Sequence, residues 1–73
     1  MSARVVIWAT VDEAAGRAVI TGQNHDALVA EIAPRAPWSR AGRGWVLSLV
    51  ELGDLCCLAQ ETGAIYRERA VKR

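Results

Sequence analysis

A chain of 73 residues has room for one small domain, which buries only about 60% of the surface of its extended chain. Hydrophobic residues make up 52% and charged residues 23%, a balance that is typical of a globular protein and argues against disorder. A buried cofactor or a deep active-site cleft would compete with so small a core, so we expect a protein that is not an enzyme and holds no cofactor. The formal net charge of +1 identifies no partner by itself.

The charges are unevenly distributed along the chain. Across residues 34–50 and 64–73 the only acid is Glu68. These two segments hold seven of the nine basic residues, namely Arg35, Arg40, Arg43, Arg67, Arg69, Lys72 and Arg73. A protein that is nearly neutral overall can therefore present one basic face.

The N-terminal part of the chain predicts a β-hairpin. Residues 4–11 are rich in β-branched side chains and include Trp8, which we expect to be a packing residue of a strand. Residues 12–16 are polar at their start and end in Gly16, which suits a turn. Residues 17–21 then form the returning strand.

A short helix and a loop follow the hairpin. Asn24 is expected to cap the helix, and Asp26 stands where a carboxylate meets the positive end of the helix dipole. Pro34 ends the helix, and a loop over residues 35–44 follows. The apolar residues that fall on one side of this helix are Leu28, Val29 and Ile32.

The C-terminal half predicts a strand, a helix and a last strand. Apolar residues alternate over residues 45–49, which is strand periodicity, and Trp45 is expected to be a core anchor. From about Val50 the period becomes helical, and Gly63 is a natural residue to end that helix. Residues 65–71 can form the last strand, with Arg67 and Arg69 on one face. The apolar stripe of the helix consists of Leu52, Leu55, Cys56 and Ala59.

The predicted element order is β-β-α-β-α-β. The chain shows no repeat, linker or coiled-coil heptad, so we expect a single domain over residues 1–73. The economical arrangement is an α+β fold with two helices packed on one face of a small, mostly antiparallel sheet.

Catalytic and metal sites find little support. His25 is the only histidine, and in the first turn of a helix it is expected at the surface. The adjacent Cys56 and Cys57 lack the spacing of a zinc site and cannot readily form a disulfide with each other. No nucleophile motif, phosphate-binding loop or dinucleotide fingerprint is present. We therefore expect no catalytic residue and no metal. With no secretory signal or membrane span, the expected location is cytoplasmic, without a membrane partner.

The loop and the strand after it are the most informative segment. Arg40 and Arg43 flank a flexible glycine turn, and arginine can bind phosphate with two parallel hydrogen bonds. Trp38 can stack on an exposed base, although it can equally be a packing residue, just as the two arginines can be solvated loop charges. The candidate nucleic-acid-binding residues are Arg35, Trp38, Arg40, Arg43, Arg67 and Arg69.

The segment from about Arg17 to Arg69 resembles the HARP domain, the small DNA-binding module of annealing helicases. The resemblance lies in the aromatic loop at residues 38–40, the Arg-x-Trp step at residues 43–45, and the strand that runs from residue 47 into a second helix. No helicase motor accompanies these residues, so the resemblance implies only the module's part, which is structure-selective DNA binding, as at junctions of single and double strands.

Two functions remain open on the sequence alone. The first is a stand-alone nucleic-acid-binding module that uses the basic aromatic loop. The alternative is a small protein-interaction module or inhibitor, such as one from a mobile element, that binds a host protein. Tryptophan and arginine are enriched at protein interface hot spots too, so these residue types fit both functions. The sequence leaves the oligomeric state open.

Overall fold

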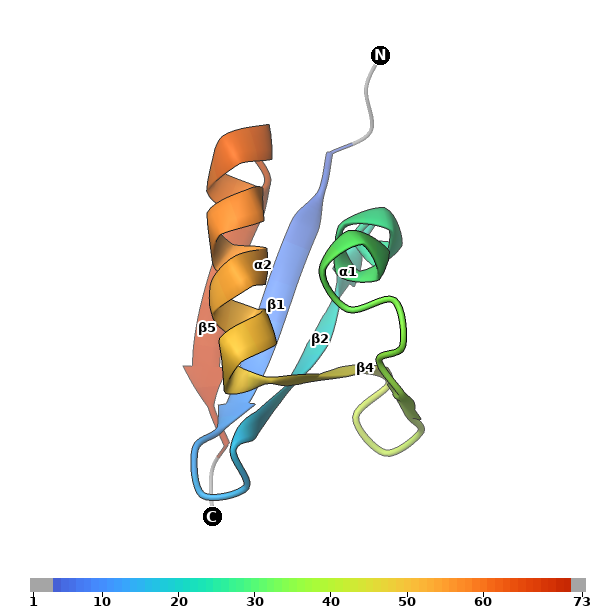
Figure 1. Ribbon diagram of the computed structural model, residues 1–73, viewed down its shortest axis with the longest axis vertical. Coiled ribbons are helices and arrows are strands. Elements are labelled where there is room, and N and C mark those ends of the chain that lie inside the picture. Colours follow the sequence, from blue (N-terminus) through green and yellow to red (C-terminus); the bar gives the residue numbers. More distant parts are fainter. Residues whose placement is uncertain (1–3, 72–73) are drawn as a thin grey trace.

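The computed structural model describes residues 4–71 (Figure 1). The element order follows the predicted one, with a short additional strand inside the segment that was expected to be a loop. In chain order the elements are β1 (Val6–Asp12), β2 (Arg17–Gln23), α1 (Asp26–Ile32), β3 (Trp38–Ser39), β4 (Gly44–Ser48), α2 (Leu49–Thr62) and β5 (Ile65–Ala70).

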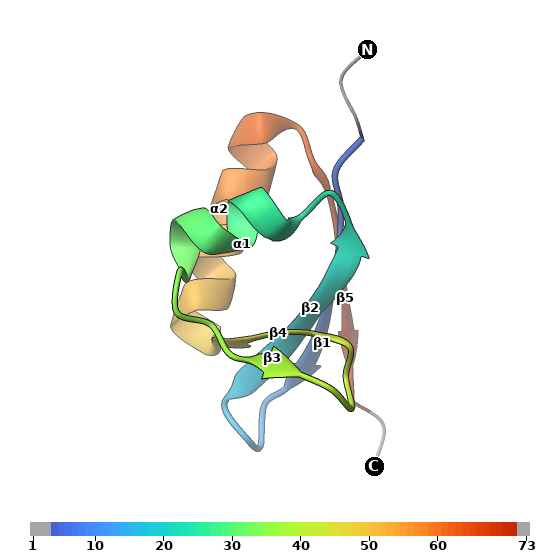
Figure 2. The same cartoon turned by 90° about the vertical axis from the view of Figure 1, so that its right-hand side faces the viewer.

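The strands form one mixed sheet in the order β3-β4-β2-β1-β5. Strand β5 pairs with β1 in parallel, whereas β1 with β2, β2 with β4 and β3 with β4 are antiparallel. Both helices lie on the same face of this sheet (Figure 2). The predicted α+β class, with two helices on one face of a mostly antiparallel sheet, is therefore confirmed.

The β1–β2 hairpin is held at both ends. In the turn, Asp12 Oδ1 accepts a hydrogen bond of 3.1 Å from the backbone N–H of Ala15. At the far end of β2, Gly22 has a φ of +140° and lies directly against the Val6 carbonyl, where any Cβ would collide. Only glycine adopts this backbone conformation without strain, so the residue preserves the close approach of the two strands.

Helix α1 begins differently from the sequence prediction. Asn24 does not cap it; the residue before the first helical turn is His25, which makes no capping hydrogen bond through its side chain. Asn24 instead takes a left-handed φ of 57°, and its Nδ2 donates a 2.9 Å hydrogen bond to the carbonyl of Arg4. Asparagine tolerates this conformation, so here it turns the chain from β2 into the helix.

Helix α2 has a cap at each end. Ser48 Oγ accepts from the Glu51 N–H at 3.2 Å, and Glu51 Oε1 accepts from the Ser48 N–H at 2.9 Å, which is a capping box. Because this box starts the helix, Leu49 is its first residue, although it was expected in the strand, and it is exposed. Gly63 ends the helix with a left-handed φ of 75°, as predicted.

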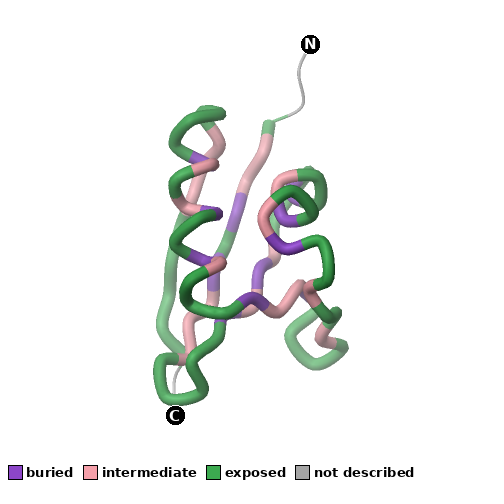
Figure 3. Tube along the Cα trace, in the orientation of Figure 1, coloured by how far each residue is buried: buried purple, intermediate pink, exposed green. Residues whose placement is uncertain are grey.

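The core lies between the sheet and the two helices (Figure 3). Leu47 of β4 and Leu55 of α2 are completely buried, and each such side chain contributes about 1.5–3 kcal/mol. Trp45, the expected anchor, is half-buried and packs against the edge of this core, so Leu47 takes the central place on β4. The buried apolar residues are Ile7, Ala9, Ala18, Ile20, Val29, Ala33, Leu47, Leu52, Leu55 and Ala59.

Candidate nucleic-acid interface

One face of the sheet carries neither helix of the described chain (Figure 2). On β1, Ile7 and Ala9 are buried beneath the helices, so the alternate residues Trp8 and Thr10 project to the opposite face. Residues that pair directly in a register share a face, which assigns the rest of this surface. We call it the open face; it includes Val6, Trp8, Thr10, Arg17, Val19, Thr21, Val46, Ile65, Arg67 and Arg69.

Trp8 is the aromatic residue at the middle of the open face. Its side chain was expected to be a packing residue, yet 39% of Trp8 is exposed. A tryptophan in a strand of mostly apolar residues gives no sign of which face it occupies. The functional candidate that the sequence prediction missed is therefore Trp8, and no local pattern in β1 distinguished its face from the face of Ile7 and Ala9.

The parallel pairing of β5 with β1 places two of the predicted site residues beside Trp8. Trp8 pairs with Arg67, and Thr10 pairs with Arg69. Both arginines are exposed. Two of the predicted candidates that lie close in sequence thus share a surface with an aromatic ring from the other end of the chain.

Arg69 is oriented by two contacts on this surface. Its Nε donates a 3.1 Å hydrogen bond to Thr10 Oγ1, and its guanidinium carbon lies 5.2 Å from the centre of the Trp8 ring. A cation–π contact of this kind contributes about 0.5–1 kcal/mol at an exposed site. Since the hydrogen bond uses Nε, the terminal nitrogens of Arg69 remain to contact an anion such as phosphate.

The neighbouring acid on β5 faces away from this surface. Glu68 alternates with Arg67 and Arg69, and its carboxylate accepts a 2.7 Å hydrogen bond from the hydroxyl of Tyr66. Burial, together with this hydrogen bond and the charge of Glu68, raises the pKa of Tyr66 above its ordinary value. The tyrosine therefore stays neutral and keeps the carboxylate engaged on the helix side.

The β3–β4 hairpin carries Arg40 and Arg43 and borders the open face. Ser39 Oγ accepts a 3.0 Å hydrogen bond from the N–H of Gly42 and tightens the turn. A Cβ on Gly42 would lie 2.8 Å from Cγ1 of Val19, an open-face residue, so the hairpin tip reaches back over β2. This packing of the tip positions its two exposed arginines, Arg40 and Arg43, next to the open face.

Trp38 belongs to the opposite side of the sheet. It pairs with Trp45, and the two rings meet edge to face with centres 5.0 Å apart. Trp45 packs against the core, and its Nε1 donates a 2.9 Å hydrogen bond to Asp26 of α1. Trp38 is 52% exposed, but its face is the one that carries the helices.

The predicted site residues thus divide into three groups. Arg67 and Arg69 lie together on the open face. Arg40 and Arg43 lie on the β3–β4 hairpin at its border, beyond β2 in the strand order. Arg35 and Trp38 lie on the helix side, Arg35 in the connection after α1. The sequence prediction, in contrast, had placed them on one surface with the other four residues.

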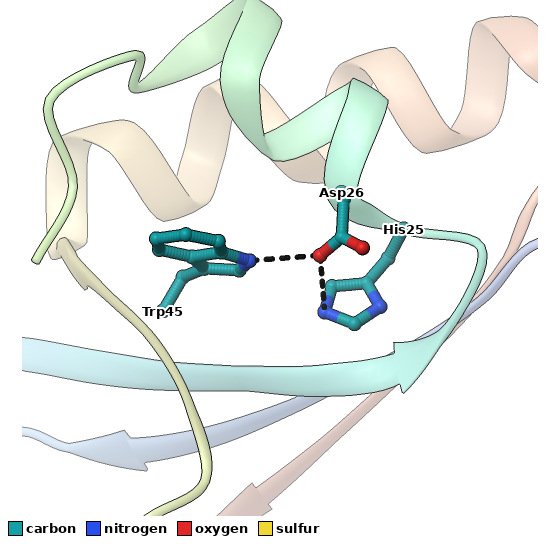
Figure 4. Close-up of polar contacts among 3 residues, drawn as sticks. All are labelled: His25, Asp26 and Trp45. Carbon is teal, nitrogen blue, oxygen red and sulfur yellow. Dashed lines mark hydrogen bonds and ion pairs between the residues drawn. The ribbon is translucent and has the colours of Figure 1, made fainter. Parts of the chain in front are cut away.

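His25 is buried, with only 8% of its surface exposed, which corrects the expectation of a surface position. Neither ring nitrogen has a hydrogen-bond partner. Its Nε2 lies 3.7 Å from Asp26 Oδ1, the oxygen that also accepts from Trp45 (Figure 4). The chain enters α1 directly after β2, and this junction turns the imidazole inward. His25 is therefore part of the packing that joins α1 to the sheet.

A shallow hollow of about 500 Å³ lies between the β1–β2 turn and the end of β5. Arg69 lines it together with the acids Asp12, Glu13 and Glu68. The acids make this end of β5 unfavourable for a polyanion. Across the sheet from Arg69 the row continues through the uncharged Thr10, Val19 and Val46, and the next arginines in that direction are those of the hairpin.

The described chain offers few other sites. Within residues 4–71 no three His, Cys, Asp or Glu side chains are grouped closely enough to hold a metal ion. Cys56 is half-buried, Cys57 is exposed, and both are free thiols. Among the same residues, no helix has the length and apolar character needed to cross a membrane.

Comparisons of this chain with protein-family models, with curated proteins and with solved structures find no match. The resemblance to the HARP domain therefore stays a prediction. The candidate interface rests on the arrangement of Trp8, Arg67 and Arg69 and on the adjacent hairpin.

Proposed function

We propose that this protein is a nucleic-acid-binding module whose interface is the open face of the sheet. The observation that supports this most strongly is the group formed by Trp8, Arg67 and Arg69 on adjacent strands, with Arg69 already oriented by Thr10. A flat aromatic ring beside guanidinium groups can stack on a base and bind phosphates at the same time. A binding role of this kind needs no catalytic group.

Electrostatics favour the same surface. The protein carries a net charge of only +1, yet five exposed arginines lie on the open face or on the hairpin beside it, namely Arg17, Arg40, Arg43, Arg67 and Arg69. Four phosphate contacts by Arg40, Arg43, Arg67 and Arg69 would give a logarithmic salt slope of about −2.8 with a single strand. Affinity should then fall about 50-fold when the salt concentration rises from 50 to 200 mM.

The sequence resemblance supports the proposal from a separate direction. The segments that resemble the HARP domain include the Arg40 and Arg43 loop, and the resemblance implies structure-selective DNA binding. In this chain the loop borders a second group of arginines on β5 across the open face. DNA is therefore the first polyanion to test.

The test is fluorescence anisotropy with labelled single-stranded, duplex and forked DNA at the two salt concentrations. The Arg67→Ala, Arg69→Ala double variant should bind at least 10-fold more weakly and lower the magnitude of the salt slope by about 1.4. Arg67→Ala alone is compared with Arg35→Ala, which removes the same charge from the helix side of the sheet. DNA binding by the double variant that equals that of the unmodified protein would overturn the proposal.

A second candidate function, protein binding, is supported by the surroundings of Trp38. This exposed ring lies against Trp45, which borders a small hollow of about 50 Å³. The other residues around that hollow are Asp26, Val29, Ala30, Ala33, Pro34 and Ala36. An exposed tryptophan beside an apolar hollow is typical of a binding hot spot. The test is a pull-down with this protein as bait. Capture of one protein in stoichiometric amount, which persists after nuclease treatment and is lost with Trp38→Ala, would favour this function over DNA binding.

A further inference from the structure

We infer that the open face selects single-stranded over double-stranded DNA, with Trp8 as the platform on which an unpaired base stacks. The inference rests on the proposed function and names the form of nucleic acid that this surface accepts. Three features of the described residues lead to it: the Trp8–Arg69 pair, the place of Trp8 inside the sheet between β2 and β5, and the position of the arginines on both sides of the ring.

The Trp8–Arg69 pair is a ready stacking surface. The indole is 39% exposed, and the guanidinium of Arg69 lies over its ring at 5.2 Å. Bases stack both on aromatic rings and on guanidinium planes, so a base can stack on the part of Trp8 that Arg69 leaves exposed or on the guanidinium above the ring. Because every base has such a face, this contact needs an unstacked base but little particular sequence.

A duplex cannot present its bases to this surface. Bases in a duplex are stacked, and their edges are read by a helix or a two-stranded ribbon that enters a groove. Both helices lie on the far side of the sheet (Figure 2), and the β3–β4 hairpin at the border of the open face offers a groove only its arginines, Arg40 and Arg43. Trp8 stands on β1 between two paired neighbours, β2 and β5. A duplex can therefore contact only the arginines, whereas a single strand gains the stacking contact as well.

The arginines lie on both sides of Trp8, which suits one continuous strand across the sheet. Arg67 and Arg69 are on β5, on one side of β1. On the other side, the hairpin tip with Arg40 and Arg43 reaches Val19 of β2. Neighbouring strands are about 4.8 Å apart, so β5 and β2 are separated by about 10 Å. A short stretch of nucleotides can thus contact both basic groups while one base lies on Trp8.

The experiment compares a labelled single-stranded 12-mer with a blunt duplex of the same sequence in 50 mM salt. We expect the single strand to bind at least 10-fold more tightly. Trp8→Leu keeps an apolar side chain on the sheet but removes the ring, so single-strand affinity should fall about 5- to 100-fold while duplex affinity changes less than 3-fold. Trp8→Phe, which restores a ring, should recover most of the lost affinity.

Val50→Ala is the control, because it shortens an exposed apolar side chain on α2, on the other side of the sheet. It should leave both affinities unchanged, and circular dichroism melting confirms that each variant is folded. Equal binding of both DNA forms by the unmodified protein, or single-strand affinity that Trp8→Leu leaves intact, would overturn the inference. If those results occur while the Arg67→Ala, Arg69→Ala variant still loses binding, the proposed function stands. If the unmodified protein binds neither DNA form, both proposals fail.

Discussion

Arg69 donates a hydrogen bond to Thr10, a residue 59 positions earlier in the chain, because β5 pairs in parallel with β1. The same guanidinium lies over the ring of Trp8. One long, flexible side chain is thus restricted by two contacts before any ligand arrives. Side chains that are ordered in advance lose less conformational entropy when they bind, which makes Arg69 a more effective anion contact than an unrestrained surface arginine.

Thr10→Val should weaken single-strand binding without disturbing the fold. Valine keeps the β-branched shape but cannot accept the hydrogen bond from Arg69, so the guanidinium regains freedom. We expect a 2- to 10-fold rise in Kd and a loss of stability of no more than about 1 kcal/mol. The measurements are anisotropy titration and thermal melting. Thr21→Val, the same change on the neighbouring strand, leaves Arg69 held; an equal effect of both variants would contradict the role of the Thr10 contact.

Gly42→Ala should displace the hairpin tip from the open face. The new Cβ would lie 2.8 Å from Cγ1 of Val19 and 3.3 Å from Oγ of Ser39. Valine is stiff at χ1 and cannot easily turn away, so we expect a cost of about 1–3 kcal/mol and weaker DNA binding. Urea unfolding measures the first effect and anisotropy the second. Gly53→Ala, in open space on α2, should instead stabilise the protein by about 0.5–1 kcal/mol. Unchanged stability in Gly42→Ala would show that the tip does not pack on β2.

His25→Leu should leave the stability unchanged or raise it. The imidazole is buried with neither nitrogen hydrogen-bonded, and an apolar side chain removes the cost of burying these polar atoms. Asp26→Ala is the contrasting variant, since it removes the acceptor of the Trp45 hydrogen bond and should cost about 1 kcal/mol. Thermal melting at neutral pH compares them. A lower melting temperature for His25→Leu than for the unmodified protein would indicate that the histidine makes a polar contact that stabilises the fold.

Ser48→Ala should weaken the start of α2. The change removes the acceptor for the Glu51 N–H and leaves half of the capping box without its partner. The expected loss is about 1 kcal/mol of unfolding free energy. Ser48→Asp keeps an acceptor at the same place and should preserve most of the stability. Chemical unfolding of both variants checks the prediction, and equal losses would mean that the cap contributes little.

Local chemistry made much of the fold predictable from the sequence. The hairpin turn before Gly16, the helix end at Gly63 and the helical stripe through Leu52 and Leu55 depend on residues close to one another in the chain. Such features are decided within a few residues, by backbone conformations that only some side chains allow. The order of the elements and the α+β class follow from them.

The candidate site depended on contacts that no local pattern contains. Both faces of β1 carry apolar residues, so alternation could not say that Ile7 is buried and Trp8 exposed. Likewise, β3 is two residues long and exists because it pairs with β4. Short elements of this kind are stabilised by the strands they pair with, and their sequence pattern is too short to predict them.

The sequence by itself determined every strand and helix except β3, and which residues carry positive charge and aromatic rings. The tertiary structure decided how these residues are grouped. Trp38, which lies near Arg40 in the chain, turned to the helix side, while Trp8, Arg67 and Arg69 met on the open face. The physical reason is that both helices pack on one face of the sheet, and the order of its strands sets which distant residues become neighbours on the other.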